Sequence, residues 1–567
     1  MTPPQASSDP TVRPETCYWS SIDTAQAYAD FSDPHDPPFS QRQYANEHGI
    51  PRSTLGYWLR QQFPDHLDPE VVDFFRRPVG HNFLRRLVGS TLLVFHHQHP
   101  CGLRAVGQFL ELAELDYFVG SSYGALYSLD KRLQQNLLLF GQEERSRLAA
   151  ALAATGVVKD IVLCPDENFH GPHPCLVLTE PVSNFLVAEV YREHRDSVTW
   201  VKVIKDGLAD LPVHVVCLTS DQASGLLCCA EKELDVQHHP DLMHLQANLG
   251  KPILLPLARP ISQAKKDLEK LKQEENRLEQ LEEERPGSYT VKMAIALIKA
   301  QEQAKEELQQ AQQTLEEAVE QIREVSRVYH PFDRETGTAV TPEQMHSRLD
   351  ETLAGLQEVV EEANLGTRAQ EAVPKAQGWV VLLVGCLAWF WSLTRQKVEE
   401  LEVSEEAEQT LLNKLIPGYY WEMASDKEKD PQQRRRLAEM AEQLKDQAWA
   451  EEGALAGLEA CKKVEVQRAA RQCAELFQRS SSCVEGRNSK LSLFHHGQTR
   501  LSATRLATLT VVHNYVVRRE DGTTAAERFF GHKQRDAFTW LLQRMPELPR
   551  PAAKRRKPYP NEPAVAA

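Results

Sequence analysis

The sequence predicts a multidomain protein of the α/β plus all-α class. Its 567 residues exceed what one hydrophobic core can serve, since domains usually hold roughly 100 to 200 residues. Between Val157 and Asp221, short valine-rich apolar runs alternate with turn residues and one helical stretch. From about Lys251 to Ser480 the helical pattern is almost continuous. We therefore expect a mixed sheet that is followed by a long helical region.

Residues 1–80 contain a pattern typical of a helix-turn-helix DNA-binding region. Ala45 and Gly49 are four residues apart within the segment Ser40–Gln61. A small residue lets two helices approach, and glycine allows the positive φ of a tight turn. The residues expected to face DNA from the start of the second helix are Arg52, Ser53 and Thr54. Two short helices of an unrelated bundle are the alternative interpretation.

Residues 81–155 form a second region that is expected to be helical. The segment Gly102–Leu133 has the pattern of a weaker second helix-turn-helix, although helix packing alone explains it as well. The run HHQHPC, His96–Cys101, offers metal-binding side chains but lacks a second ligand pair at zinc-site spacing. We do not predict a zinc site there.

Residues 156–250 carry the expected sheet. Apolar runs bounded by turn residues indicate strands, and apolar positions at helical spacing indicate helices. The expected order is strand, strand, strand, helix, strand, helix, short strand, helix. In the same order, these elements fall within Asp160–Phe169, Cys175–Tyr191 (two strands), Asp196–Pro212, Val213–Asp221, Ala223–Leu234, Asp235–His238 and the residues from His244 onward.

Residues 251–478 are expected to form an all-helical insertion that begins with an antiparallel coiled-coil hairpin. The hairpin is predicted to turn at Pro286–Gly287. A leucine stripe at coiled-coil-like spacing supports it, made of Leu268, Leu271, Leu278 and Leu281. Farther along, the apolar run Trp379–Leu393 is shorter than the ~20 residues that span a bilayer, so we expect a buried helix and no membrane partner.

Charge is unevenly distributed along the chain. The net charge of -15 argues against DNA binding by the chain as a whole, because phosphate binding depends on Lys and Arg. From Gly486 to the end, however, there are 15 Lys and Arg against 6 Asp and Glu. Residues 546–567 are expected to be a basic, disordered tail, and its run Lys554, Arg555, Arg556 and Lys557 suits non-specific binding to the DNA backbone or, alternatively, serves solubility.

The eleven cysteines contain no CxxC pair, and the N-terminus lacks the pattern of a signal peptide. A reducing cytoplasm is the expected location.

Two aspartates follow predicted strands at positions suited to metal binding. Asp166 lies near the end of the first strand and Asp221 directly after the fourth. Two-metal phosphoryl transfer needs carboxylates that converge on ions about 3.5–4 Å apart. Asp160 is a competing first ligand, but it lies at the start of its strand. Glu485, in the first turn of a helix expected after Ser480–Ser482, is the candidate third ligand.

Four segments resemble the successive acidic blocks of bacterial DDE transposases, whose catalytic core is ribonuclease-H-like: PDENFHGPHPCLVLTEP, LTSDQASGLL, DLMHLQANLGK and SSSCVEGRNSKL. The resemblance spans about Asp160–Gly250 and again Arg479–Met545, and the second stretch makes residues 479–545 the second part of the core. It implies that Asp166, Asp221 and Glu485 are catalytic and bind two Mg²⁺ ions, for which Mn²⁺ can substitute. The Tyr, Arg and Lys that flank the catalytic Glu in one branch of these enzymes are absent here.

The resemblance also implies partners and supporting residues. The expected substrate is double-stranded DNA, at transposon ends and target, bound by a homodimer or higher oligomer in the bacterial cytoplasm. Residues that could support the ligands are Glu167, Asp241, His244 and Asn488, and the alternative is that they are hydrogen-bonded structural polar groups. Arg487 and Lys490 flank Glu485 and either hold phosphates or are surface charges of the helix.

Two alternatives stay open: a non-catalytic DNA-binding regulator, such as a domesticated transposase, and a structural or assembly protein organised by the helical hairpin. The chain has no GxxxxGK[ST] phosphate loop, so an ATP-driven motor is not expected.

Overall fold

The computed structural model describes residues 21–33, 35, 40–169, 173–284, 288–497, 501–545 and 547–551. The chain divides into two compact units. Unit 1 combines residues 1–151 with residues 490–567, and unit 2 is the continuous stretch 152–489. The expected domain boundaries differ from this division, because most of the segment 479–545 groups with the N-terminal helices rather than with the sheet.

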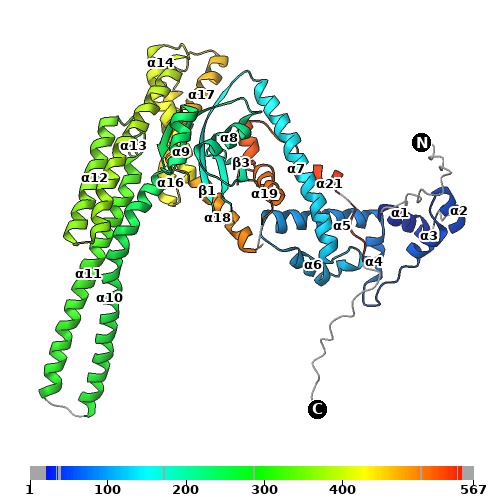
Figure 1. Ribbon diagram of the computed structural model, residues 1–567, viewed down its shortest axis with the longest axis horizontal. Helices are drawn as coiled ribbons and strands as arrows, with labels where there is room; N and C mark the ends of the chain where they lie inside the picture. Colours follow the sequence, from blue (N-terminus) through cyan, green and yellow to red (C-terminus); the bar gives the residue numbers. More distant parts are fainter. Residues whose placement is uncertain are drawn as a thin grey trace. The chain divides into compact units, whose positions relative to one another are not determined.

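Unit 1 is helical throughout its described part (Figure 1). Its elements are α1 Ser21–Ser32, α2 Gln41–Glu47, α3 Arg52–Leu59, α4 Pro69–Arg76, α5 Pro78–Thr91, the π-helix η1 Leu92–Gln98, α6 Leu103–Leu112, the 3₁₀ turn η2 Leu115–Tyr117, most of α7 Tyr123–Ala153, the end of α18 Ser482–Gly497, α19 Ala503–Tyr515, α20 Ala525–Phe530 and α21 Ala537–Arg544.

Helices α2 and α3 form a short helix-turn-helix. Ser40 caps α2 by accepting a hydrogen bond from the Gln43 amide, and Gly49 has φ 65° in the turn. Ala45 is buried against α1 and α3 in a small apolar core that includes Leu55 and Trp58. Small side chains and a left-handed glycine therefore close this turn for the steric reasons that the sequence indicates.

The segment Gly102–Leu133 does not repeat that geometry. Helix α6 ends at Leu112, and α7 begins only at Tyr123 after an irregular link that contains η2. Gly107 is required in α6, since a Cβ there would lie 2.6 Å from the Ser121 carbonyl oxygen. Close packing at Gly107 therefore holds the link between α6 and α7 against α6. This link, residues 113–122, is longer than the turn of a helix-turn-helix.

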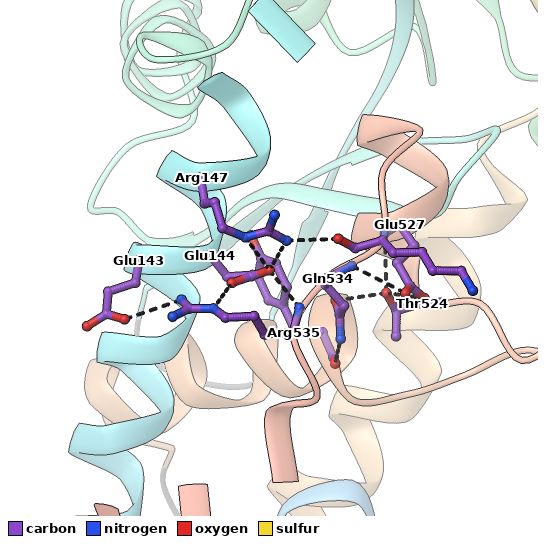
Figure 2. A network of polar contacts seen from close by, with 9 residues as sticks. Glu143, Glu144, Arg147, Thr524, Glu527, Gln534 and Arg535 are labelled. Carbon is purple, nitrogen blue, oxygen red and sulfur yellow. Dashed lines mark hydrogen bonds and ion pairs between the residues drawn. The ribbon is translucent and has the colours of Figure 1, made fainter. Parts of the chain in front are cut away.

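A buried ionic network ties α7 to the C-terminal helices of unit 1 (Figure 2). The Glu144 side chain is fully buried and accepts hydrogen bonds from the Arg535 amide at 2.9 Å and the Arg535 Nε at 2.6 Å. Arg147 completes the set by bonding both Glu144 and the Lys533 carbonyl. Two guanidinium groups thus compensate one buried carboxylate, as burial of a charge requires.

The histidines of HHQHPC take part in a second buried network rather than a metal cluster. His97 Nε2 lies 2.8 Å from Asp130 on α7, and Arg505 of α19 bonds the His97 ring and the His96 carbonyl. His96 Nδ1 pairs with the Cys101 carbonyl at 2.6 Å. Both histidine rings are therefore engaged by protein groups.

Unit 2 contains a five-stranded mixed sheet with strand order β3-β2-β1-β4-β5. The strands are β1 Lys159–Asn168, β2 Cys175–Glu180, β3 Phe185–Tyr191, β4 Val213–Ser220 and β5 Gln237–Pro240. Strands β1, β2 and β3 pair antiparallel, whereas β4 and β5 run parallel to β1. The prediction of a mixed sheet is confirmed, with β5 two residues later than expected.

Helices connect these strands in the expected order. They are α8 Ser197–Leu208, α9 Ser224–Cys228 with the π-helix η3 Cys229–Leu234, and α10 Leu242–Glu284. Helix α8 packs on β3 and inserts the fully buried Trp200. All residues of β2 are buried, which explains why the apolar run there has no polar alternation.

The long helix α10 pairs with α11, Ser288–Val328, to form the hairpin (Figure 1). The expected turn at Pro286–Gly287 lies outside the described residues. Helix α10 starts beside β5 and continues without interruption past Lys251, so the expected domain boundary falls inside one helix. It also contains Pro252, Pro256 and Pro260.

The remaining helices of unit 2 build one large core with the hairpin base. They are α12 Pro342–Glu362, α13 Thr367–Glu399, α14 Glu405–Thr410, the π-helix η4 Leu411–Leu415, α15 Ile416–Lys427, α16 Pro431–Ala448, α17 Ala460–Glu475 and the start of α18.

Within the described residues, one helix is long and apolar enough to cross a membrane, namely α13. Its most apolar window is 39% buried inside the protein. Leu383, Leu387 and Phe390 belong to the core of unit 2, while Val381 is 66% exposed.

Candidate functional site

The carboxyl ends of β1 and β4 bring Asp166 and Asp221 to the same level of the sheet. The two strands are parallel neighbours, and their last registered pair is Leu163 with Leu218. Asp166 and Asp221 each lie three residues beyond that pair. Burial, together with a smaller contribution from the negative charge of Asp221, raises the pKa of Asp166 to about 6. The two carboxylates therefore repel one another, which a bound cation would relieve.

Asp160 lies at the opposite end of β1. Its carboxylate pairs with His214 at 2.9 Å and with Lys397. These two partners balance the charge of Asp160, which lies far along β1 from Asp166. This placement leaves Asp166 as the only one of the two competing aspartates at the site.

Asp241 and His244 occupy the junction between β5 and α10. The Asp241 amide donates to the Ser220 carbonyl at 2.9 Å, and its buried carboxylate accepts from the Met243 amide at 2.8 Å. The second carboxylate oxygen accepts from His244 Nδ1 at 3.0 Å. Although burial opposes ionisation, the bonds from His244 and Ser481 hold the pKa of Asp241 below its ordinary value.

The same bond controls His244. Its hydrogen bond to Asp241 raises the pKa of His244, and the charges of Asp241, Asp221 and Asp166 add to this effect. Because Nδ1 of His244 is hydrogen-bonded to Asp241, Nε2 is the ring nitrogen that could bind a ligand. A carboxylate that orients a histidine in this way is a common arrangement behind metal ligands.

Glu485 reaches this edge from α18. One ligand atom from each of Asp241, His244 and Glu485 lies within 4.8 Å of the others, close enough to hold a metal ion. The segment before α18 is fixed to the sheet, because the Leu242 amide donates to the Arg479 carbonyl at 3.1 Å and Ser481 Oγ bonds Asp241. The chain thus returns from the helical region directly beside β5.

Asn488 links α18 to β1. Its Nδ2 donates to Asp166 Oδ2 at 2.7 Å, and its Oδ1 accepts from Asn168 Nδ2 at 3.3 Å. Three residues after Glu485, Asn488 lies on the same face of the helix. It therefore sets the orientation of the Asp166 carboxylate relative to Glu485.

Arg487 has a different place from the one expected. Its guanidinium is buried and donates two hydrogen bonds to the buried Glu189 of β3, from Nε at 2.7 Å and from Nη2 at 2.6 Å. A phosphate could reach this group only if the pair broke. We therefore reassign Arg487 from DNA contact to the anchoring of α18 on the sheet.

Other expected site residues are located as follows. Glu167 points away from Asp166, as alternation along a strand requires, and it accepts from Arg195 at 2.6 Å. Arg52 and Ser53 are exposed at the start of α3, and Thr54 is half-buried. Lys490 is half-buried on α18. Lys554, Arg555, Arg556 and Lys557 lie outside the described residues.

The donor set fits a hard divalent cation. The grouped ligand atoms are carboxylate oxygens of Asp241 and Glu485, which Mg²⁺ and Mn²⁺ prefer, and a nitrogen of His244, which Mn²⁺ accepts. Asp166 and Asp221 are not part of this group, although Asn488 joins Asp166 to α18. The sequence did not indicate Ser481 as a partner of Asp241. The only signal there was the spacing of Asp241 and His244, three residues apart at a predicted helix start.

Comparisons with known proteins add little about function. A family described as "Family of unknown function (DUF6399)" matches residues 411–557. That stretch includes Glu485 but neither Asp166 nor Asp221. No curated protein matches the chain, and no solved structure does.

Proposed function

We propose that this chain is a DNA transposase of the DDE type, built on a ribonuclease-H-like core that the helical region of unit 2 interrupts. The observation that carries the proposal is the placement of acidic residues from distant segments on a sheet with order β3-β2-β1-β4-β5: Asp166 and Asp221 lie near the ends of neighbouring parallel strands, and Glu485 groups with Asp241 and His244 beside β5. Asp166 comes from β1, Asp221 from the end of β4 and Glu485 from α18. A purely structural role does not call for like charges to gather in this way.

In this proposal, Asp166, Asp221 and Glu485 hold two Mg²⁺ ions, or Mn²⁺ in their place. When bound, the ions would activate water or a 3′-hydroxyl and offset charge on the scissile phosphate. Asn488 keeps the Asp166 carboxylate in one orientation by donating to Oδ2. Asp241 holds His244 through Nδ1 and leaves its second nitrogen for the same space.

Unit 1 would supply DNA binding. The exposed start of α3, with Arg52 and Ser53, has the placement that recognition helices use in the major groove. Tyr57, 64% exposed on the same helix, extends that surface. The proposed partners are double-stranded transposon ends and target DNA, bound by at least two copies of the chain in the bacterial cytoplasm.

The test is strand cleavage by the purified full-length chain. The substrate is a labelled duplex that carries the sequences flanking its own gene, incubated with Mg²⁺ or Mn²⁺. Asp166→Asn, Asp221→Asn and Glu485→Gln should each reduce cleavage by orders of magnitude while leaving DNA binding intact. The matched control is Asp206→Asn, because Asp206 is an exposed aspartate on α8.

Two results would contradict the proposal. Cleavage that survives Asp221→Asn would remove the carboxylates from the mechanism. DNA binding without any cleavage by the unaltered chain would favour the alternative of a non-catalytic regulator, which the helix-turn-helix geometry of α2 and α3 equally suits.

A further inference from the structure

An exposed aromatic ring and an arginine lie together where β1 ends. Phe169 follows β1 directly, three residues after Asp166, and its side chain is 60% exposed. The Arg195 guanidinium carbon lies 5.3 Å from the centroid of the Phe169 ring. Arg195 precedes α8, and its side chain is 56% exposed. The fold therefore presents a large apolar group and a cation to solvent side by side.

Arg195 is held in place by buried groups. Its Nη1 donates to Glu167 Oε2 at 2.6 Å, and Glu167 Oε1 accepts from Trp200 Nε1 at 3.5 Å. Trp200 is fully buried under the sheet. The bond to Glu167 raises the pKa of Arg195, so its positive charge persists. Among the described residues, Glu167 is the only hydrogen-bond partner of the guanidinium, and Phe169 adds a cation–π contact.

The pair belongs to the same edge of the sheet as the acidic site. The negative charge of Asp221 contributes to the raised pKa of Arg195. Glu167 is adjacent to Asp166 in the chain, although the two side chains point to opposite faces of β1. A polynucleotide strand that crosses this edge would meet both the carboxylates and the Phe169–Arg195 pair.

We propose that Phe169 and Arg195 form a nucleotide subsite that grips an unpaired nucleotide next to the scissile phosphate. The base stacks on the Phe169 ring, and a phosphate oxygen accepts hydrogen bonds from the free N–H groups of Arg195. Stacking on an aromatic ring needs an unstacked base, so the ligand is single-stranded or locally opened DNA. The inference rests on the proposed function and adds the strand state of its substrate.

The probe is a short DNA duplex with a single-stranded extension that carries 2-aminopurine beside the junction. Its emission changes when the base stacks on a ring. With the full-length chain, we expect the emission change to vanish in Phe169→Ala and to persist in Phe169→Tyr. Binding should weaken by about tenfold in Phe169→Ala, because stacking stabilises each base by roughly 1–3 kcal/mol.

Arg195→Ala should weaken binding and lower the slope of log affinity against log salt by about one, as loss of one phosphate contact requires. The controls are Val198→Ala, which shortens an exposed residue on α8, and Arg435→Ala, which removes an exposed cation on α16. Neither should change the emission or the salt slope.

The outcomes separate the two proposals. If the unaltered chain cleaves DNA but Phe169→Ala binds the probe with the same affinity and emission change, the subsite is wrong and the transposase proposal stands. If the unaltered chain neither binds nor cleaves DNA, both are wrong.

Discussion

The buried pair of Arg487 and Glu189 makes a sharp prediction about how the site is held together. The Arg487 side chain is 3% exposed and that of Glu189 is fully buried. Arg487→Met removes the cation and leaves the carboxylate in the protein interior. Two charge-assisted hydrogen bonds are lost, each of which stabilises by about 1.5–3 kcal/mol. Breaking a buried pair costs about 3–5 kcal/mol in other proteins, so both routes give a similar magnitude.

The double variant separates the cost of a stranded charge from that of lost packing. Glu189→Leu together with Arg487→Met replaces the pair by apolar groups, and this exchange is often close to neutral. We therefore expect the double variant to recover most of the stability that Arg487→Met loses. In contrast, Arg435→Ala breaks an exposed pair with Glu439 and should change stability by less than about 0.5 kcal/mol.

Hydrogen–deuterium exchange gives the local readout. Because about 1.4 kcal/mol corresponds to a tenfold change, a loss of about 3–5 kcal/mol should make amides of α18 and β3 that open with the pair exchange about 100- to 4,000-fold faster in Arg487→Met. Metal-dependent cleavage should fall too, since Glu485 and Asn488 lie on the same helix. Unchanged exchange in Arg487→Met would refute the anchoring role, as would a double variant less stable than the single one.

Three further changes test other parts of the fold. Burial lowers the pKa of His97 to about 4, against 6.5 when exposed; the unfolded chain then binds more protons between these values, so thermal melts should show unit 1 losing up to about 3 kcal/mol as pH falls from 6.5 to 4. His97→Gln should flatten that dependence, and an unchanged pH profile would contradict it. Asp241→Asn should weaken Mn²⁺ binding about 10- to 100-fold in calorimetry, because His244 loses its orienting partner; equal affinity would exclude that role. Glu144→Ala removes the buried carboxylate that pairs with Arg147 and Arg535, so that Arg535 keeps only its half-buried partner Glu143, and should cost about 3–5 kcal/mol in denaturant unfolding. Glu143→Ala is the control, and equal midpoints for the two variants would rule out the expected cost.

The strand positions of Asp166 and Asp221 were predictable because local pattern determines them. An apolar run that ends in an acidic residue indicates a buried strand. The acidic residue marks the point at which the chain leaves the core. The parallel pairing of β1 and β4 then follows from the helix between them. Local pattern also located the turn at Gly49, where sterics admit few residues.

Arg487 shows where such reasoning stops. Its partner Glu189 lies on β3, far away in the sequence, and nothing near Arg487 distinguishes a buried ion pair from a phosphate contact. The same holds for Arg505, which bonds His97 of η1 and so places α19 in unit 1. The positions of these two arginines depend on charged partners that are distant in the sequence. The periodicity of apolar residues does not indicate such pairs.

The prolines of α10 have a mechanical consequence. Pro252, Pro256 and Pro260 are four residues apart and so lie along one face of the helix. Because proline has no amide hydrogen, the carbonyls of Asn248, Pro252 and Pro256 lack their usual helical hydrogen-bond donors. The helix therefore bends most easily at this stretch. The helix beyond Pro260 is about 36 Å long, so a bend of roughly 10° there swings the distal hairpin by about 6 Å. His244 lies before the first proline, so a bend at the prolines would move the distal hairpin and leave the start of α10 beside β5 in place.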